Sequence, residues 1–271
     1  MPKFQEKKLK SFIDFVKMVG IMQSQSNVLW YRGCGNYKYP LIPSLYRHKQ
    51  KVSIGDLANL ENDLMTRFRQ TSVPFHSKSL NEEWETLFFM QHYGIPTRLL
   101  DWTENPFMAL FFAVMMANTR LDKRGKMRFS SPVSVWVLDP IKWNQHALNH
   151  VSFKGGILTT NGEQIKSYKP ILDARSISDN LPVALYGVHN SPRIVAQRGV
   201  FMIFGQSKLP MEKVYSKYNF PKNCLIKLTI DKSMIQKIKN SIFNHGITES
   251  VVFPELDGLA KEIKRIFGFE S

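Results

Sequence analysis

The sequence predicts a single α+β domain. Helical patterns dominate the first half of the chain, whereas strand patterns mixed with helices dominate the second half. This order is typical of helices packed against one sheet. The length of 271 residues suits one large domain, or one domain with a small appendage. We expect residues 1–24 to form an N-terminal helical segment and residues 25–271 to form one globular domain.

The first predicted elements are a helix, a strand and a second helix. Apolar residues recur at helical spacing over residues 9–23, and Ser11 is suited to cap this helix. Residues 28–33 show a short strand pattern, and the two prolines within residues 39–47 favour an extended loop. Residues 54–71 form an amphipathic helix, whose apolar face contains Leu57, Leu60, Leu64 and Phe68.

A polar segment separates the next two predicted helices. The helix over residues 80–93 ends at Gly94, because glycine is a frequent helix stop. Residues 94–103 are then expected to be a tight turn. The following helix covers residues 106–117 with proline at its first position. Its predicted face includes small residues that let another backbone approach closely: Ala109, Phe112, Ala113 and Met116.

Strand patterns continue to the C-terminal part of the chain. Residues 121–131 read as a basic, exposed linker, and residues 134–138 as an apolar strand. Residues 193–205 are expected to be two short strands with a bend at Arg198-Gly199. Residues 225–230 alternate apolar and polar types, as a half-buried strand does. Two helices complete the chain, over residues 233–243 and 256–267.

The composition shows a large positive charge. The chain contains 37 Lys and Arg against 22 Asp and Glu, which gives a formal net charge of +15 and a pI of about 9.8. Such a field attracts polyanions, and nucleic acid is the commonest of them. The alternative is a soluble protein that happens to be basic, because composition alone discriminates weakly.

The remaining composition favours a cytoplasmic protein without a metal or a membrane anchor. Cys34 and Cys224 are the only cysteines, and they suit a reducing compartment. The first ten residues lack the apolar core of a signal peptide, and the apolar stretch over residues 106–117 is shorter than the roughly 20 residues that span a bilayer. Seven scattered histidines show no ligand spacing, so no metal site is expected.

Two polar groupings near the N-terminal half are candidates for a functional site. Arg32, at the end of the first predicted strand, can present a bidentate fork to phosphate or carboxylate, and Gly33 leaves room for a ligand. Polar and aromatic types then crowd between the two helices: Gln91, His92, Arg98, Asp101, Trp102 and Thr103. Structural explanations stay open, namely an Arg98–Asp101 pair, a Thr103 helix cap and a buried His92.

Two further groupings lie in the C-terminal half. Gln197 and Gly199 interrupt an apolar segment ahead of Phe201, which indicates either a site or a simple bend. The carboxylates in residues 246–258 offer a general base, or they only complement helix ends. These are Glu249, Glu255 and Asp257. The sequence contains no phosphate-binding glycine-rich loop, dinucleotide fingerprint or Gly-x-Ser-x-Gly elbow.

Together these segments resemble the FRG-domain family, which is named for an aromatic-Arg-Gly motif. The matching segments are Tyr31-Arg32-Gly33, residues 41–47 (Leu-Ile-Pro-Ser-Leu-Tyr-Arg), residues 91–103 (Gln-His-Tyr-Gly-Ile-Pro-Thr-Arg-Leu-Leu-Asp-Trp-Thr), residues 105–113 and residues 253–259 (Phe-Pro-Glu-Leu-Asp-Gly-Leu). The resemblance covers residues 25–265, nearly the whole chain. It implies an occurrence in bacteria and phages and an association with phage defence or toxin systems.

A second, weaker resemblance is to ADP-ribosyltransferases of the Arg-Ser-Glu class. Those enzymes carry an aromatic-Arg pair on a first strand, a Ser-Thr-Ser strand followed by a helix rich in Ala and Phe, and a Glu or Gln ahead of an apolar pair on a third strand. Tyr31-Arg32-Gly33, residues 101–103 with the following helix, and residues 197–201 are similar to these elements in order. Gln197 stands where a catalytic Glu is expected. The resemblance implies a split mixed β-sheet core with helices.

This second resemblance implies NAD as the substrate. The residues expected to bind it are Tyr31, Arg32, Gly33, His92, Arg98, Asp101, Trp102, Thr103 and Phe201. Among them Tyr31, Trp102 or Phe201 is expected to stack on the nicotinamide ring. The catalytic group is expected to be Gln197, Glu249 or Glu255, with a carboxylate stabilising the positive charge that develops on the ribose.

The predicted function is that of a toxin or phage-defence effector that transfers ADP-ribose from NAD to a nucleic acid, RNA rather than DNA. The alternative is a nucleic-acid-binding or nuclease module without NAD chemistry, which the charge and the basic linker also motivate. In either case an antitoxin protein is a candidate partner, and no membrane partner is expected.

Overall fold

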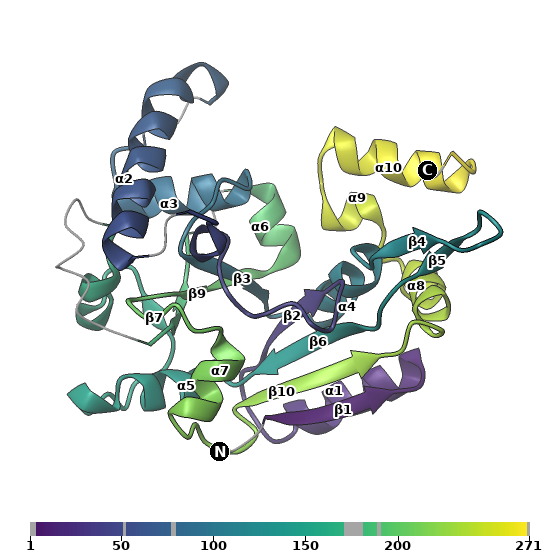
Figure 1. The fold of residues 1–271 in the computed structure, drawn as a ribbon, viewed down its shortest axis with the longest axis horizontal. Coiled ribbons are helices and arrows are strands. Elements are labelled where there is room, and N and C mark those ends of the chain that lie inside the picture. Colours follow the sequence, from purple (N-terminus) through teal and green to yellow (C-terminus); the bar gives the residue numbers. More distant parts are fainter. Residues whose placement is uncertain (1–3, 51–52, 77–79, 171–180, 189–190, 270–271) are drawn as a thin grey trace.

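A computed structural model describes residues 4–50, 53–76, 80–170, 181–188 and 191–269 of the chain. Its centre is an eight-stranded mixed sheet in the order β1-β10-β6-β2-β3-β9-β8-β7 (Figure 1). Strand β1 pairs parallel with β10, and β7 pairs parallel with β8, whereas the other neighbours are antiparallel. The strands are β1 (Gln5–Leu9), β2 (Trp30–Cys34), β3 (Leu99–Thr103), β6 (Val133–Leu138), β7 (Leu158–Thr159), β8 (Val183–Tyr186), β9 (Gly199–Ile203) and β10 (Leu225–Ile230).

Helices cover the sheet, and a separate hairpin extends from it. The helices are α1 (Phe12–Gln23), α2 (Ile54–Thr71), α3 (Glu83–His92), α4 (Pro106–Met115), α5 (Pro140–Ala147), α6 (Pro192–Gln197), α7 (Met211–Lys217), α8 (Ile235–Asn244), α9 (Glu249–Val252) and α10 (Leu256–Ile266), with short 3-10 turns at Leu45–Arg47, Val73–Phe75, Asn149–Val151 and Glu163–Tyr168. Strands β4 (Thr119–Leu121) and β5 (Met127–Phe129) pair with each other in a second, two-stranded sheet. The structure therefore confirms the α+β class.

The large sheet consists of two halves that meet at one position. Strand β2 pairs with β6 over Trp30–Cys34, and β3 pairs with β9 over Leu99–Thr103. Between β2 and β3, Tyr31 opposite Thr103 is the single residue pair within the described chain. The two strands therefore diverge on one side of this pair, and the sheet opens between its halves.

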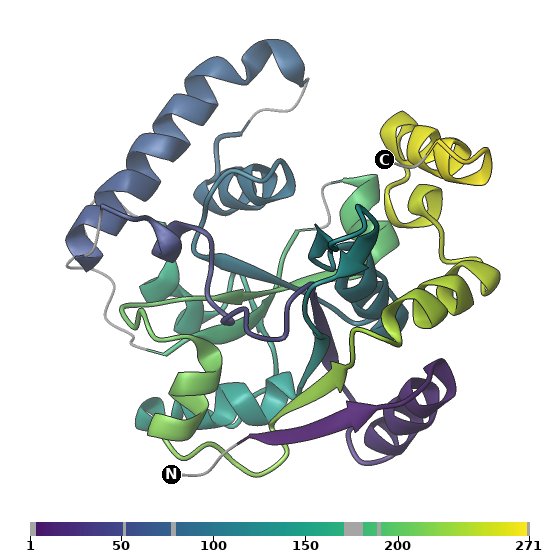
Figure 2. The ribbon, with the colours of Figure 1, turned by 45° about the vertical axis from the view of Figure 1, so that its right-hand side comes forward.

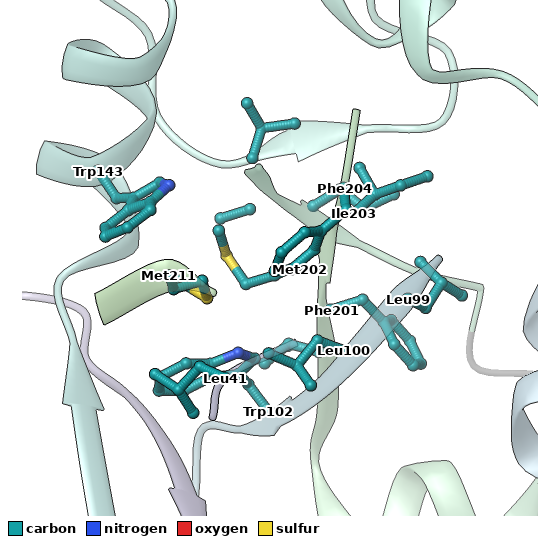
Figure 3. Close-up of a cluster of buried hydrophobic side chains, with 14 of the residues drawn as sticks. Leu41, Leu99, Leu100, Trp102, Trp143, Phe201, Met202, Ile203, Phe204 and Met211 are labelled. Atoms are coloured by element: carbon teal, nitrogen blue, oxygen red, sulfur yellow. The ribbon is translucent and has the colours of Figure 1, made fainter. Parts of the chain in front are cut away.

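Each face of the sheet has its own apolar core. On one face α1, α4 and α8 pack on β2, β6 and β10 and lie side by side (Figure 2), with Phe15, Phe111 and Ile238 among the buried residues. The opposite core joins β3, β8 and β9 to the segments around α2, α3, α5 and α7. Trp102 and Met202 lie in this second core (Figure 3). Because both faces are covered, the sheet is buried along most of its length.

Several predicted elements are confirmed. Helix α2 has the predicted bounds, Ile54–Thr71. Ser11 caps α1 by accepting a hydrogen bond from the Asp14 amide at 3.0 Å. Strands β6 and β10 and helices α8 and α10 also occur close to their predicted positions. Strand β10 differs in one respect, because all six of its residues are buried and its polar Lys227 packs against Trp136.

The tertiary structure also corrects three local predictions. The segment expected to be a turn after Gly94 contains a central strand, β3, since Leu99 and Leu100 are buried in the apolar core that β3 shares with β8 and β9. The first of the two strands predicted within residues 193–205 is the short helix α6, which ends where Arg198 adopts a left-handed φ of 46°. The N-terminal segment contains, besides α1, an edge strand that pairs with β10.

Helix α4 approaches β2 so closely that one β2 position requires glycine. A Cβ atom added to Gly33 would lie 1.9 Å from the carbonyl oxygen of Ala109 and 2.6 Å from the amide nitrogen of Ala113. The small residues of α4 thus permit the close backbone approach that the sequence indicated. The space at Gly33 is filled by the helix backbone, which corrects the expectation that it is left for a ligand.

We expect Gly33→Ala to destabilise the protein by about 1–3 kcal/mol or more, because the added methyl group overlaps backbone atoms that cannot move aside independently. Gly20→Ala is the matched control, since that position lies in α1 and has no atom within 4 Å of an added Cβ. It should stabilise the protein by about 0.5–1 kcal/mol. Urea unfolding of both variants measures the difference, and equal stabilities would contradict the close contact.

Candidate functional site

A cavity of about 220 Å³ lies where the two halves of the sheet separate. Residues from β2, α3, β3, α4, α6 and β9 line it, so segments far apart in the sequence meet here. Nine of the residues predicted from the sequence belong to this lining: Tyr31, Arg32, Gly33, His92, Asp101, Trp102, Thr103, Gln197 and Phe201. The convergence of the three predicted strand segments follows from the neighbouring positions of β2, β3 and β9 in the sheet.

Arg32 bridges the opening between β2 and β3. Its Nη1 donates a hydrogen bond to the backbone oxygen of Asp101 and lies 4.0 Å from the Asp101 carboxylate. The carboxylate also accepts a hydrogen bond of 2.8 Å from Nε2 of Gln91, and the Gln91 side-chain oxygen accepts one from the Thr97 hydroxyl. The Arg32 side chain remains about a quarter exposed. A guanidinium oriented by this network, and still accessible, is suited to bind an anionic group.

Thr103 connects β3 to the segment that ends in Gln197. Its hydroxyl donates to the Gln197 backbone oxygen at 2.6 Å and accepts from the Asn105 amide at 2.9 Å. Asn105, rather than Thr103, caps α4, because its side-chain oxygen accepts from the amides of the first turn. The Gln197 side chain donates from Nε2 to the Val252 oxygen at 3.0 Å. The hydroxyl therefore positions the chain where β3, α4 and α6 meet.

The three aromatic residues expected to stack on a ligand are all buried. Tyr31 has no exposed surface, and Trp102 and Phe201 are each 3% exposed. Trp102 packs among Leu41, Leu100 and Met211 in the apolar core (Figure 3). The half-buried ring in the cavity lining is that of Phe112, on α4. Burial raises the pKa of Tyr31 to about 12, and the nearby Gln23 side chain opposes this shift only weakly, so the phenol is neutral at physiological pH.

A second cavity of about 470 Å³ adjoins the first, and both share Arg32, Gln91, His92, Asp101 and Arg193 in their linings. Glu255 lines only the second, and its Oε1 lies 4.0 Å from Nε2 of His92. On its other side, Nδ1 of His92 lies 3.2 Å from the Ser191 hydroxyl. Burial and the nearby Arg193 lower the pKa of His92, and Glu255 opposes this shift. His92 is therefore neutral at pH 7.

Two predicted residues lie away from both cavities. Arg98 is 1% exposed, and it donates to Glu61 at 2.8 Å and to the Tyr168 oxygen at 3.0 Å. The expected pair of Arg98 with Asp101 is thus incorrect, because Arg98 pairs with Glu61 and Asp101 faces Arg32 instead. Glu249 is buried beneath Arg265, whose Nε donates to both of its carboxylate oxygens at 3.0 Å.

Sequence reasoning missed Arg193 and the role of Phe112 as a lining residue. Arg193 lines both cavities, and its guanidinium carbon lies 4.8 Å from the centre of the Phe253 ring. The sequence predicts a strand that begins at Arg193, and this prediction gave no reason to place Arg193 beside Arg32. The Ser191-Pro192 start of a capped helix was the available signal, since the Ser191 hydroxyl accepts from the Ile194 amide.

Comparison with protein families gives a match to part of the chain. The family model of the FRG domain matches residues 27–122, which include β2, β3 and α4. This stretch of the chain is therefore similar to the FRG domain, in agreement with the resemblance seen in the sequence. Curated proteins and solved structures gave no match to the sequence. The matched FRG segment supplies Arg32, Asp101 and Thr103, whereas Gln197 and Glu255 come from outside it.

The described residues contain neither a membrane-spanning helix nor a metal-binding cluster. No helix in these ranges is long and apolar enough to cross a membrane. Among the same residues, no group of three or more His, Cys, Asp or Glu side chains is arranged to hold a metal ion. Both cysteines, Cys34 and Cys224, are buried free thiols.

We expect Arg98→Met to cost about 3–5 kcal/mol in unfolding free energy, because it leaves the Glu61 carboxylate buried without its partner. The double variant Arg98→Met/Glu61→Leu should recover most of this loss, since it removes both charges. Denaturant unfolding of the two single variants and the double variant measures the coupling. A loss below about 1 kcal/mol in the single variant would contradict a structural role for Arg98.

The lowered pKa of His92 predicts a dependence of stability on pH. Between its folded pKa and the unfolded value of about 6.5, the unfolded state binds more protons than the folded state, so stability falls as the pH is lowered through this window. In His92→Gln, unfolding free energies measured from pH 7.5 to pH 5 should fall less steeply than in the wild type. Parallel curves for the two proteins would show that His92 does not titrate in this way.

Proposed function

We propose that the chain binds NAD in the cavity between β2 and β3 and transfers ADP-ribose to a nucleic acid, with RNA as the preferred acceptor. The supporting observation is the convergence of Arg32, Thr103 and Gln197, from three separate sequence segments, on one cavity. Their order along the chain is the one that motivates the resemblance to ADP-ribosyltransferases. The α+β class and the opening of the sheet are compatible with it.

The chemistry of the lining fits a dinucleotide. Arg32 and Arg193 supply two guanidinium groups shared by both cavities, and paired cations of this kind suit a pyrophosphate. The half-buried ring of Phe112 gives an aromatic surface in the smaller cavity, and we assign it the stacking role expected of Tyr31, Trp102 or Phe201. The larger cavity lies within the range of roughly 300–1,000 Å³ typical of small-molecule sites.

Transfer breaks the bond between the ribose C1′ and the nicotinamide nitrogen, which leaves with the bonding electrons, while an acceptor oxygen or nitrogen bonds to C1′ and loses a proton. A carboxylate near C1′ stabilises the positive charge that develops on the ribose. Glu255 is the proposed carboxylate, because it lines the adjoining cavity and is half exposed. Gln197 remains a candidate for orienting the ribose, whereas the pairing of Glu249 with Arg265 argues against that residue.

A second candidate function is nucleic-acid binding or cleavage without NAD chemistry. The net charge of +15 and the exposed basic hairpin formed by β4 and β5 favour it. Consumption of NAD separates the two candidates, since only the first requires it. For either activity we propose a toxin or phage-defence setting with an antitoxin as partner, which growth after induced expression with and without the neighbouring gene products tests.

We expect Arg32→Ala to reduce ADP-ribose transfer by roughly 100-fold or more, as about 3 kcal/mol of charge-assisted hydrogen bonding is lost. Arg32→Lys should retain part of the activity, because it keeps the charge without the fork. The measurement is incorporation of label from NAD, radiolabelled in the adenylate phosphate, into total RNA, with DNA and protein as alternative acceptors.

The control for this experiment is Lys213→Ala, an exposed cation of α7 that lines neither cavity. Melting temperatures of all variants show whether they are folded. A wild-type protein that neither consumes NAD nor labels any acceptor would refute the proposed function. Full activity in a folded Arg32→Ala variant would remove Arg32 from the site.

A further inference from the structure

The β4–β5 hairpin is an arm that begins beside the cavity. Met116, which lines the cavity, is the C-cap residue of α4 and lies three positions before the start of β4 at Thr119. Two backbone hydrogen bonds anchor its base, from the Asn118 amide to Gly35 and from the Ser130 amide to Asn118. Beyond this base the two strands pair with each other and extend away from the large sheet (Figure 1). The arm is thus fixed at one end to the wall of the site.

Positive charge is concentrated on this arm. Its five cationic side chains are all exposed: Arg120, Lys123, Arg124, Lys126 and Arg128. The carboxylate within the same stretch is Asp122, which accepts hydrogen bonds from the Arg124 and Lys126 amides at 2.9 and 3.0 Å and from Nε of Arg128 at 3.2 Å. These hydrogen bonds, led by those from the two amides, lower the pKa of Asp122. The carboxylate therefore stays ionised and organises the turn, and it offsets one of the five positive charges.

The pairing of the two strands brings like charges together, and an anionic ligand would relieve their repulsion. Arg120 lies directly opposite Arg128 in the antiparallel register, and like charges in this position destabilise a hairpin. The neighbouring pair, Leu121 opposite Met127, is apolar and exposed by 64% and 57%. The arm thus offers closely spaced guanidinium groups together with apolar side chains in water. Phosphates and unstacked bases have complementary properties.

We infer that the β4–β5 hairpin binds single-stranded nucleic acid and holds the acceptor strand against the cavity. Three of its cations are arginines, whose fork geometry suits phosphate, and a chain of phosphodiesters presents one charge per nucleotide along the ribbon. The description of the strand as an acceptor rests on the proposed function. Binding to the hairpin does not, because it needs no NAD.

The test is fluorescence anisotropy of the full-length protein with a labelled 20-nucleotide single-stranded RNA, from 50 to 200 mM KCl, without NAD. The triple variant Arg120→Gln/Arg124→Gln/Lys126→Gln keeps the hydrogen bonds to Asp122, which involve only Arg128 and two backbone amides. Loss of three phosphate contacts should weaken binding roughly 10- to 100-fold at 0.1 M salt and reduce the slope of log K against log salt by about 2.

The matched control is Lys213→Gln/Lys217→Gln/Lys222→Gln, which removes the same charge from exposed positions on and after α7. In Figure 1, α7 lies at the lower left of the molecule, whereas β4 and β5 lie at its right-hand side. The binding constant of this control variant should stay within about twofold of the wild-type value, and its salt slope should stay within about 0.5 of the wild-type slope. This is the result expected for cations that touch no phosphate. Equal weakening by the two triple variants would overturn the inference.

A second variant separates binding from folding of the arm. Arg120→Glu places opposite charges across the strand pair, so it should maintain or raise the melting temperature while weakening RNA binding. Unchanged RNA binding in this folded variant would refute contact with the hairpin. Equally tight binding of polyglutamate would refute the assignment to nucleic acid. Hairpin-dependent RNA binding in a protein without transfer activity would instead count only against the proposed transferase.

Discussion

The single pairing position between β2 and β3 is the constraint on which the site depends. Tyr31 and Thr103 join the two halves of the sheet, and beyond them the strands separate. A buried sheet normally satisfies its backbone groups with ladder hydrogen bonds, so an opening in the middle must be stabilised by other contacts. Here Arg32 donates to the Asp101 backbone oxygen, and α4 packs tightly against β2 at Gly33. The cavity is thus built from a break in regular pairing.

Hydrogen bonds between side chains hold the edges of this opening. Thr97, Gln91, Asp101 and Arg32 form one continuous chain of contacts from the end of α3 across β3 to β2. Thr103 makes a second connection from β3 to the end of α6. Side chains that orient one another in this way lose less conformational entropy when a ligand binds, because they are already ordered.

The two arginines of the FRG-matched segment that the sequence singled out differ in physical role. Arg98 is enclosed with Glu61 and two backbone oxygens, and it ties α2 to the polar segment before β3. Arg32 keeps part of its surface accessible and faces a carboxylate that is itself exposed. A buried arginine satisfied on all sides has no capacity left for a ligand, whereas Arg32 retains it. Arg98 therefore supports the fold, whereas Arg32 can act in the site.

The sequence by itself determined the α+β class, the bounds of α2, the cap of α1 and nine of the residues that line the cavity, since these follow from local periodicity, capping chemistry and short motifs. Only the tertiary structure decided that β3 is a central strand, that residues 192–197 form a helix, and that Arg193 and Phe112 reach the cavity while Arg98 and Glu249 do not. These properties depend on pairing and burial between segments separated by tens of residues. A sequence pattern indicates which local conformation a segment prefers. Which other segment packs against it, and so buries its side chains, is decided only in the tertiary structure.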